Sequence, residues 1–168
     1  MTRKAGMLLT ACLLLLFSLT GCGGGGGGGG GGDADPLYSE ISAQTDGFIA
    51  AVNAGNLDEA MGFVDSNLFY YPMNGESVRI SAFRDRLAAF LQGSSERQVV
   101  IEDREVLSNG ETSALFAGRL ACTWKDLAGV SHTAAPETVE MFWEWNAKWG
   151  ITKISGHADQ GLAFPPAP

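Results

Sequence analysis

The sequence has few cysteines, few basic residues and few histidines, and each shortage argues against a class of protein. It contains 11 lysines and arginines against 19 acidic residues, with a formal net charge of −8 at pH 7. Because no Lys/Arg cluster is present, we expect no nucleic-acid partner and no electrostatic attraction to anionic lipid. The two histidines, His132 and His157, lack His-x-His or paired-carboxylate spacing. We therefore expect no metal site.

Recognisable catalytic motifs are also missing. The chain has no Gly-x-Ser-x-Gly motif that would present a nucleophile. Its uninterrupted glycine run at 23–32 lacks the Lys-Ser/Thr pair, the preceding strand and the following helix of a phosphate-binding loop. We therefore expect no cofactor. Since glycine loses much backbone freedom on ordering and has no side chain to bury, residues 22–35 are predicted to be a flexible linker.

The first 21 residues have the layout of a secretory signal. Arg3 and Lys4 supply the positive charge, and an apolar segment follows over Met7–Leu19. This segment is short for a membrane span, which needs about 20 apolar residues. The segment ends in Leu19-Thr20-Gly21-Cys22.

That tetrapeptide resembles the lipobox of bacterial lipoproteins, in which the cysteine is acylated by diacylglycerol and the chain is cut before it. The resemblance implies a signal peptide over 1–21, lipidation of Cys22, and export to the cell envelope with the lipid as membrane anchor. In a host with two membranes, Gly23 after the cysteine would imply the outer membrane, facing the periplasm. An ordinary signal peptide or an N-terminal membrane helix, with a chance cysteine, stays open as an alternative.

The mature chain would keep one cysteine, Cys122, besides the predicted lipid site. A cut before Cys22 leaves 147 residues, which suits one domain, with nine basic and 19 acidic residues. No intrachain disulfide is expected, because Cys12 leaves with the signal. Cys122 lies in an alternating apolar segment, which favours a buried small side chain over a catalytic thiol.

Helical periodicity fills the first part of the domain and strand alternation fills the rest. Apolar stripes predict helices at about 36–53 and 78–92, and Asn56 with Glu59 forms a capping-box-like start for a short helix between them. A hairpin turn is expected at Asn109-Gly110, a longer loop at 126–135, and strands at 68–71, 98–107, 112–125, 137–146 and 149–157. With a domain over 36–160 and a flexible proline-rich tail at 161–168, this order predicts an α+β fold. Three N-terminal helices would pack on a curved antiparallel sheet.

The order of these elements resembles the nuclear transport factor 2-like superfamily, which includes SnoaL-like domains, over roughly 38–157. The resemblance rests on Asn-Ala-Gly-Asn-Leu-Asp-Glu-Ala at 53–60, Asn-Gly-Glu-Thr-Ser-Ala at 109–114 and Trp-Gly-Ile at 149–151. It implies a cone-shaped half-barrel with a pocket between sheet and helices. Many members dimerise through the outer sheet face, so a homodimer is expected as one possible assembly. Fold alone says little about function.

The catalytic chemistry of the isomerase-like members does not transfer to this chain. They place a general-base aspartate just before a proline after the first strand, where this chain has Tyr71 before Pro72. A tyrosine with a pKa near 10 is not a resting base at neutral pH. Since Tyr70 and Tyr71 alternate faces, one of them should point inward, as a wall of a ligand pocket or as ordinary packing.

Few titratable side chains remain as candidates for acid/base chemistry. Glu140 and Glu144 share one strand face, and Trp143 and Trp145 share the other. Because the tryptophan face is the more apolar, we expect it to face inward and the two glutamates to face outward. Glu140 and His157 are the residues that an enzyme of this chain would use.

Four tryptophans on the later strands could line an aromatic ligand pocket, although core packing with a sheet-face dimer contact is the favoured interpretation of them. Trp124, Trp143 and Trp145, together with Tyr70 and Tyr71, are the candidate ligand contacts. We expect an extracytoplasmic, non-catalytic domain that binds a small, largely apolar ligand or a protein partner. The alternatives are a small isomerase, dehydratase or hydrolase using Glu140 or His157, and a structural module of an envelope complex.

Overall fold

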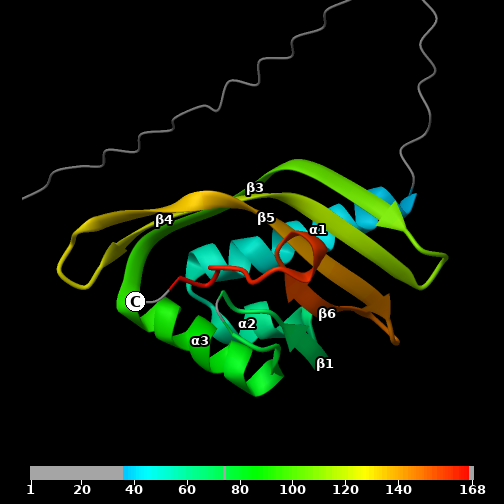
Figure 1. Cartoon of the computed structure of the whole chain (residues 1–168), viewed down its shortest axis with the longest axis horizontal. Coiled ribbons are helices and arrows are strands. Elements are labelled where there is room, and N and C mark those ends of the chain that lie inside the picture. The colour runs from blue at the N-terminus through cyan, green and yellow to red at the C-terminus, as the bar shows by residue number, and fades with distance from the viewer. Residues whose placement is uncertain (1–35, 74, 167–168) are drawn as a thin grey trace, which may run out of the picture. The chain divides into compact units, whose positions relative to one another are not determined.

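Three helices lie on one side of a curved six-stranded sheet in the computed structural model of this chain (Figure 1). The structure describes residues 36–73 and 75–166. The predicted signal peptide, the predicted lipidation site Cys22 and the predicted glycine linker lie outside these residues. The predicted α+β fold, with helices packed on a curved sheet, is confirmed.

The helices form where the apolar stripes predict them. They are α1 (Pro36–Ala54), α2 (Leu57–Gly62) and α3 (Ile80–Gly93). Ile41, Phe48 and Val52 of the α1 stripe are buried. The predicted cap of α2 is confirmed, because the Asn56 side chain accepts a hydrogen bond from the Glu59 N–H at 3.2 Å and donates one to its carboxylate at 2.8 Å.

The sheet is mostly antiparallel, in the order β2-β1-β6-β5-β4-β3. The strands are β1 (Val64–Tyr70), β2 (Val78–Arg79), β3 (Ser94–Ser108), β4 (Ser113–Asp126), β5 (Ser131–Trp145) and β6 (Trp149–Ser155). Only the β1–β6 pairing is parallel among these six strands. The long strands β3, β4 and β5 arch over α1 in Figure 1.

The prediction of a long loop at 126–135 is wrong, because the turn is shorter. β5 begins at Ser131, and His132 pairs with Trp124 across the β4–β5 hairpin. The turn is short because one oxygen of the Asp126 carboxylate accepts hydrogen bonds from the backbone N–H groups of Ala128 and Val130, at 2.9 Å each. Because the Asp126 side chain closes the turn within five residues, the residues from Ser131 onward can pair with β4.

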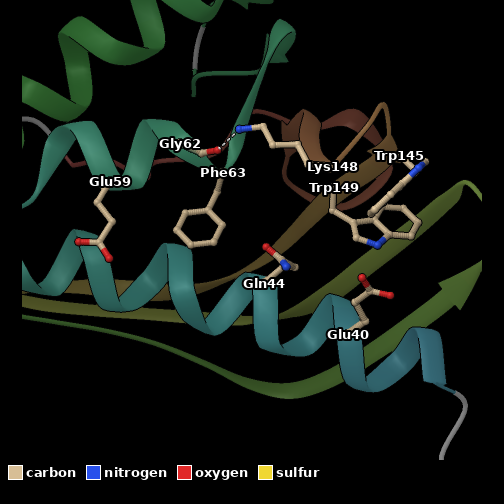
Figure 2. Close-up of a pocket in the computed structure, with 8 residues that line it drawn as sticks. All are labelled: Glu40, Gln44, Glu59, Gly62, Phe63, Trp145, Lys148 and Trp149. Carbon is tan, nitrogen blue, oxygen red and sulfur yellow. Dashed lines mark hydrogen bonds between the residues drawn. The ribbon is translucent and has the colours of Figure 1, made fainter.

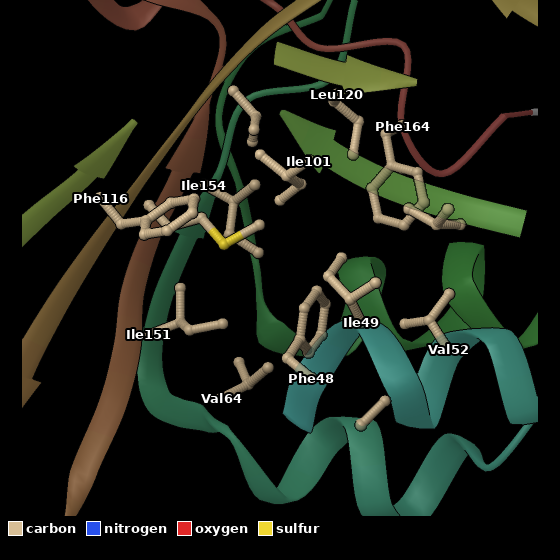
Figure 3. Close-up of a cluster of buried hydrophobic side chains, with 14 of the residues drawn as sticks. Phe48, Ile49, Val52, Val64, Ile101, Phe116, Leu120, Ile151, Ile154 and Phe164 are labelled. Carbon is tan, nitrogen blue, oxygen red and sulfur yellow. The ribbon is translucent and has the colours of Figure 1, made fainter. Parts of the chain in front are cut away.

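Side chains fill the space between the sheet and the helices. Figure 3 shows Phe48, Ile49 and Val52 of α1 facing side chains from the strands. Trp143 and Met141 of β5 and Phe116 of β4 are fully buried in the same cluster. Gly118 of β4 also belongs to this layer, and a Cβ there would clash with the Ile101 side chain. The interior is therefore packed at close range.

The C-terminal segment 161–166 packs into the domain, which corrects the expected flexible tail. Leu162 is fully buried and Phe164 is 2% exposed. The segment, red in Figure 1, runs between the long strands and α3, and the Phe164 ring lies 6.3 Å from that of Phe90. The Leu162 N–H donates to the Tyr71 carbonyl at 2.8 Å, and the Leu162 carbonyl accepts from Met73 at 2.9 Å. Burial of two large apolar side chains explains why this proline-rich end stays attached.

Candidate functional site

Tyr70 points into the interior and its hydroxyl is already used. It is fully buried, and the hydroxyl donates to the Phe164 carbonyl oxygen at 2.8 Å, with the Leu162 carbonyl oxygen at 3.2 Å. The Arg86 guanidinium donates to the same hydroxyl at 3.4 Å. Burial raises the pKa of Tyr70 above its ordinary value. Tyr70 therefore fastens the C-terminal segment rather than lining an open pocket.

Trp143 also belongs to the packed interior, as expected from its strand face. It is fully buried, and its indole Nε1 has no hydrogen-bond partner among the described residues. Tyr71, on the opposite face from Tyr70, is half-buried. The structure thus places the inward tyrosine and the inward tryptophan in the core.

Trp124 lies at the other end of the β4–β5 hairpin from Trp145. Its ring stacks on His132 with centroids 5.3 Å apart, and packs edge-on against Phe90. His132 Nε2 lies 2.9 Å from the Asp126 carboxylate. Hydrogen bonds from the His132 side chain and from Val130 hold the pKa of Asp126 below its ordinary value. This cluster stabilises the hairpin end, and Trp124 packs from there against the core that contains Tyr70 and Trp143.

Glu140 and His157 meet on the outer sheet face, outside the packed interior. His157 belongs to a short 3-10 turn, η1 (His157–Asp159), and its Nδ1 lies 3.0 Å from the Glu140 carboxylate. The Glu140 side chain is 12% exposed, whereas that of His157 is 74% exposed. A groove of about 550 Å³ contains both residues together with Glu105 and Arg119. The two catalytic candidates therefore form a pair, but one open to water.

A cleft lined by three aromatic side chains lies between α1, α2 and the β5–β6 turn (Figure 2). We call it the tryptophan cleft. Its volume is about 570 Å³, and it is lined by Glu40, Gln44, Glu59, Gly62, Phe63, Trp145, Lys148 and Trp149. Trp145 is 47% exposed, and its ring stands edge-to-face against Trp149 with centroids 5.7 Å apart. One predicted ligand contact, Trp145, thus lies in an open site.

The tryptophan cleft is lined by both a lysine and glutamates, but among the described residues the lysine is already hydrogen-bonded and one glutamate is not. The Lys148 ammonium donates a hydrogen bond to the Gly62 carbonyl oxygen at 2.7 Å and points away from the indoles in Figure 2. Glu40 is exposed and makes no hydrogen bond or ion pair within the described part of the chain. Figure 2 shows its carboxylate turned toward the Trp145 and Trp149 rings. The free charge beside the aromatic surface is therefore negative.

Most residues of this cleft were not identified from the sequence. Glu40 and Gln44 occupy successive turns of the polar side of α1, a pattern that looks like an ordinary solvated face. Phe63 follows the end of α2, where a lone aromatic reads as packing. The usable signal was the short 146–148 turn, which brings Trp145 and Trp149 into register as a pair.

The described residues contain neither a candidate metal cluster nor a helix that could cross a membrane. No group of three or more His, Cys, Asp or Glu side chains there could hold a metal ion. None of the helices within 36–73 and 75–166 is long and apolar enough to cross a membrane.

Solved structures resemble this domain although sequence comparisons find no relative. No family model matches the chain, and no curated protein matches its sequence. A protein from Xanthomonas campestris assigned as a calcium/calmodulin-dependent protein kinase II association domain superposes with a TM-score of 0.62 at 22% identity, covering 73% of this chain and 87% of its own. A protein from Streptomyces avermitilis assigned as a dehydratase of the NTF2-like family gives 0.61 at 10% identity, covering 70% and 92%.

An NTF2-like protein from Cytophaga hutchinsonii gives a TM-score of 0.62 at 12% identity, covering 76% of this chain and all of its own. The domain is therefore of the α+β class in which helices fill the inside of a curved, unclosed sheet. In particular, it has the nuclear transport factor 2-like fold. At these identities the likeness shows the fold alone, since its neighbours include enzymes and association domains.

Proposed function

We propose that this protein is a lipid-anchored, extracytoplasmic domain that binds a small, largely apolar ligand without catalysing a reaction. The observation that carries the proposal is the tryptophan cleft, where two indoles and Phe63 border an open volume of about 570 Å³. Small-molecule sites are concave, largely apolar and of about 300–1,000 Å³. The space between sheet and helices, by contrast, is occupied by core side chains and by Phe164.

The alternative of a small enzyme using Glu140 or His157 is less well supported. A general acid or base works best in a site that excludes water and holds the substrate against it. His157 is 74% exposed, and Tyr70, which an enzyme pocket would place beside Glu140, lies on the opposite face of the sheet. The pair instead holds η1 against β5, because the Ala158 N–H also approaches Glu140 at 3.4 Å.

The test of the binding proposal compares the protein with a variant of the cleft. The chain is purified from cells and examined by native mass spectrometry, with Trp145→Ala and the exposed-loop variant Leu127→Ala alongside. Because Trp145 supplies the exposed ring of the site, we expect a retained small molecule in the parent and in Leu127→Ala but not in Trp145→Ala. Retention in all three proteins would contradict the cleft as the binding site.

The lipid anchor is tested separately at its cysteine. Cells expressing the parent or Cys22→Ser are labelled with an alkyne fatty acid, and their membrane and soluble fractions are compared. We expect the label and the membrane association to disappear together in Cys22→Ser, because two acyl chains on one cysteine supply the anchoring energy. A variant that stays in the membrane unlabelled would point to an uncleaved N-terminal helix instead.

A second function, self-association, is favoured by the outer sheet face. One row of side chains crosses all six strands there, and its pairings connect Leu107, Leu115, Phe142, Lys153, Phe69 and Arg79 in that order. Leu107 is 51% exposed and Phe69 is 39% exposed. Exposed apolar side chains such as these two suit a protein interface. Two of the similar solved structures are association domains, and we propose a second copy of this chain as the occupant.

A further inference from the structure

We propose that the ligand of the tryptophan cleft is a small organic cation of the quaternary ammonium class. The inference rests on the proposed binding function and adds the charge of the ligand to it. Three features carry it: an exposed indole face, an unpaired carboxylate beside that face, and a neighbouring ammonium that is already engaged.

The two indole rings of the cleft, Trp145 and Trp149, stand nearly perpendicular to each other. Trp145 and Trp149 meet at an interplanar angle of 71° with centroids 5.7 Å apart. In an edge-to-face pair, the ring that presents its edge keeps both of its own faces free of its partner, and the other ring keeps one face free. Trp149 is 5% exposed and serves as the fixed wall, whereas Trp145 is 47% exposed. The face of tryptophan is the aromatic surface that attracts cations most strongly, through its quadrupole.

The charged groups around the two indoles favour a cation over a neutral or anionic ligand. Glu40 and Glu59 both line the cleft, and Glu59 is partly satisfied by the Asn56 amide at 2.8 Å. Glu40 has no partner within the described part of the chain, and it is the carboxylate turned toward the indoles in Figure 2. Lys148 does not neutralise Glu40, since its ammonium is bonded to the Gly62 carbonyl oxygen.

The same features argue against a metal ion. A hard divalent cation needs six or more oxygen ligands, or four well-placed side chains for zinc. The cleft supplies two carboxylates on different helices, on either side of Phe63 in Figure 2. A methylated ammonium, in contrast, needs no directed ligands, because it interacts with ring faces and diffuse negative charge.

The experiment uses two probes of equal shape and different charge. The full chain, in an uncharged detergent, is titrated with choline and with 3,3-dimethylbutan-1-ol, the neutral carbon analogue of choline, while tryptophan fluorescence is recorded. A contact between a cation and a partly desolvated indole is worth up to about 2 kcal/mol, so we expect choline to bind on the order of tenfold more tightly than its analogue. Choline binding should also weaken as salt is raised.

Variants then assign the effect to the cleft. Glu40→Gln should remove most of the preference for choline while leaving the analogue unchanged, and Trp145→Ala should weaken both probes. Glu111→Gln, which removes an exposed charge at the β3–β4 turn, is the matched control and should behave like the parent. Unaltered choline affinity in Glu40→Gln would overturn the assignment of charge.

The outcomes separate this inference from the function on which it rests. Equal affinity for choline and its analogue would overturn the cationic ligand and leave the apolar binding cleft standing. If neither probe binds, the inference also fails, and the native mass spectrometry of Trp145→Ala then decides the proposed function by itself.

Discussion

Single residues at the C-terminal end of the domain show how polar groups are matched inside an apolar interior. Glu137 accepts the Ala163 N–H at 3.1 and 3.0 Å with its two carboxylate oxygens. Burial raises the pKa of Glu137 above its ordinary value, against the lowering effect of these backbone hydrogen bonds. Burial likewise raises the pKa of Cys122 to about 11. Cys122 is 2% exposed, so the predicted burial of this thiol is confirmed.

The raised pKa of Glu137 has a consequence for stability against pH. A carboxyl group with a higher pKa in the folded state binds its proton more tightly there than in the unfolded chain. Its contribution to stability is therefore largest below the unfolded pKa, near 4.3, and declines as the pH rises through the folded pKa. We expect Glu137→Gln to flatten the decline in stability between pH 4 and neutrality, as measured by urea unfolding at several pH values.

Glu111→Gln is the control for this series, because it removes a carboxyl group at an exposed turn. Its unfolding profile should follow that of the parent. Parallel profiles for the parent and Glu137→Gln would show that Glu137 titrates equally in the folded and unfolded states.

At the scale of elements, the C-terminal segment acts as part of the core although it has no regular secondary structure. Tyr70, Glu137 and Tyr71 each bond its backbone, from β1, β5 and the residue after β1. The segment thereby closes one end of the space between the sheet and α3. In this chain the inside of the cone is completed by its own C-terminal residues.

Removing one anchor of that segment should lower the free energy of unfolding markedly. Phe164 contacts Phe90 and is 2% exposed, and the loss of a buried phenyl ring costs about 3–5 kcal/mol. We expect Phe164→Ala to lose an amount in this range by chemical denaturation. Leu127→Ala is the matched control: Leu127 is 83% exposed, and a surface change is worth about 0.5 kcal/mol or less. If both variants lose equally little free energy of unfolding, the C-terminal segment is not part of the cooperative folding unit.

At the scale of the whole molecule, the two faces of the sheet differ in what covers them. The inner face is covered by α1, α3 and the C-terminal segment, while the outer face carries the row from Leu107 to Arg79. Two cations lie over its aromatic rings, with Arg79 3.7 Å from the Phe69 centroid and Lys153 Nζ 3.9 Å from that of Phe142. This outer face is the surface that we propose for self-association.

Self-association through this row predicts a change in oligomeric state. We expect the parent to sediment as a dimer and Leu107→Asp to sediment as a monomer, because a carboxylate would be buried unpaired at the interface. Leu127→Asp introduces the same charge at an exposed site outside the row and should stay dimeric. Circular dichroism checks that the fold of each variant is retained. A monomeric parent would contradict the outer face as a self-association surface.

Local sequence patterns determined the elements of this domain. The Ile41, Phe48 and Val52 stripe, the Asn56 cap and the alternation of β5 each depend on neighbours within a few residues, so they could be predicted from the chain. The inward direction of Trp143 and the outward direction of Glu140 followed from that alternation. The predicted lipid anchor at Cys22 is also a purely local signal.

Only the tertiary structure decided which distant residues meet. Glu40 and Trp145 are more than a hundred residues apart in the sequence but line the same cleft. Leu162 and Phe164 are buried because β1, β5 and α3 surround them. The proline-rich end of the chain carries no periodicity that would report such burial. Contacts of this kind depend on how the sheet curves and where its hairpins end, which is a property of long-range packing and not of any one segment.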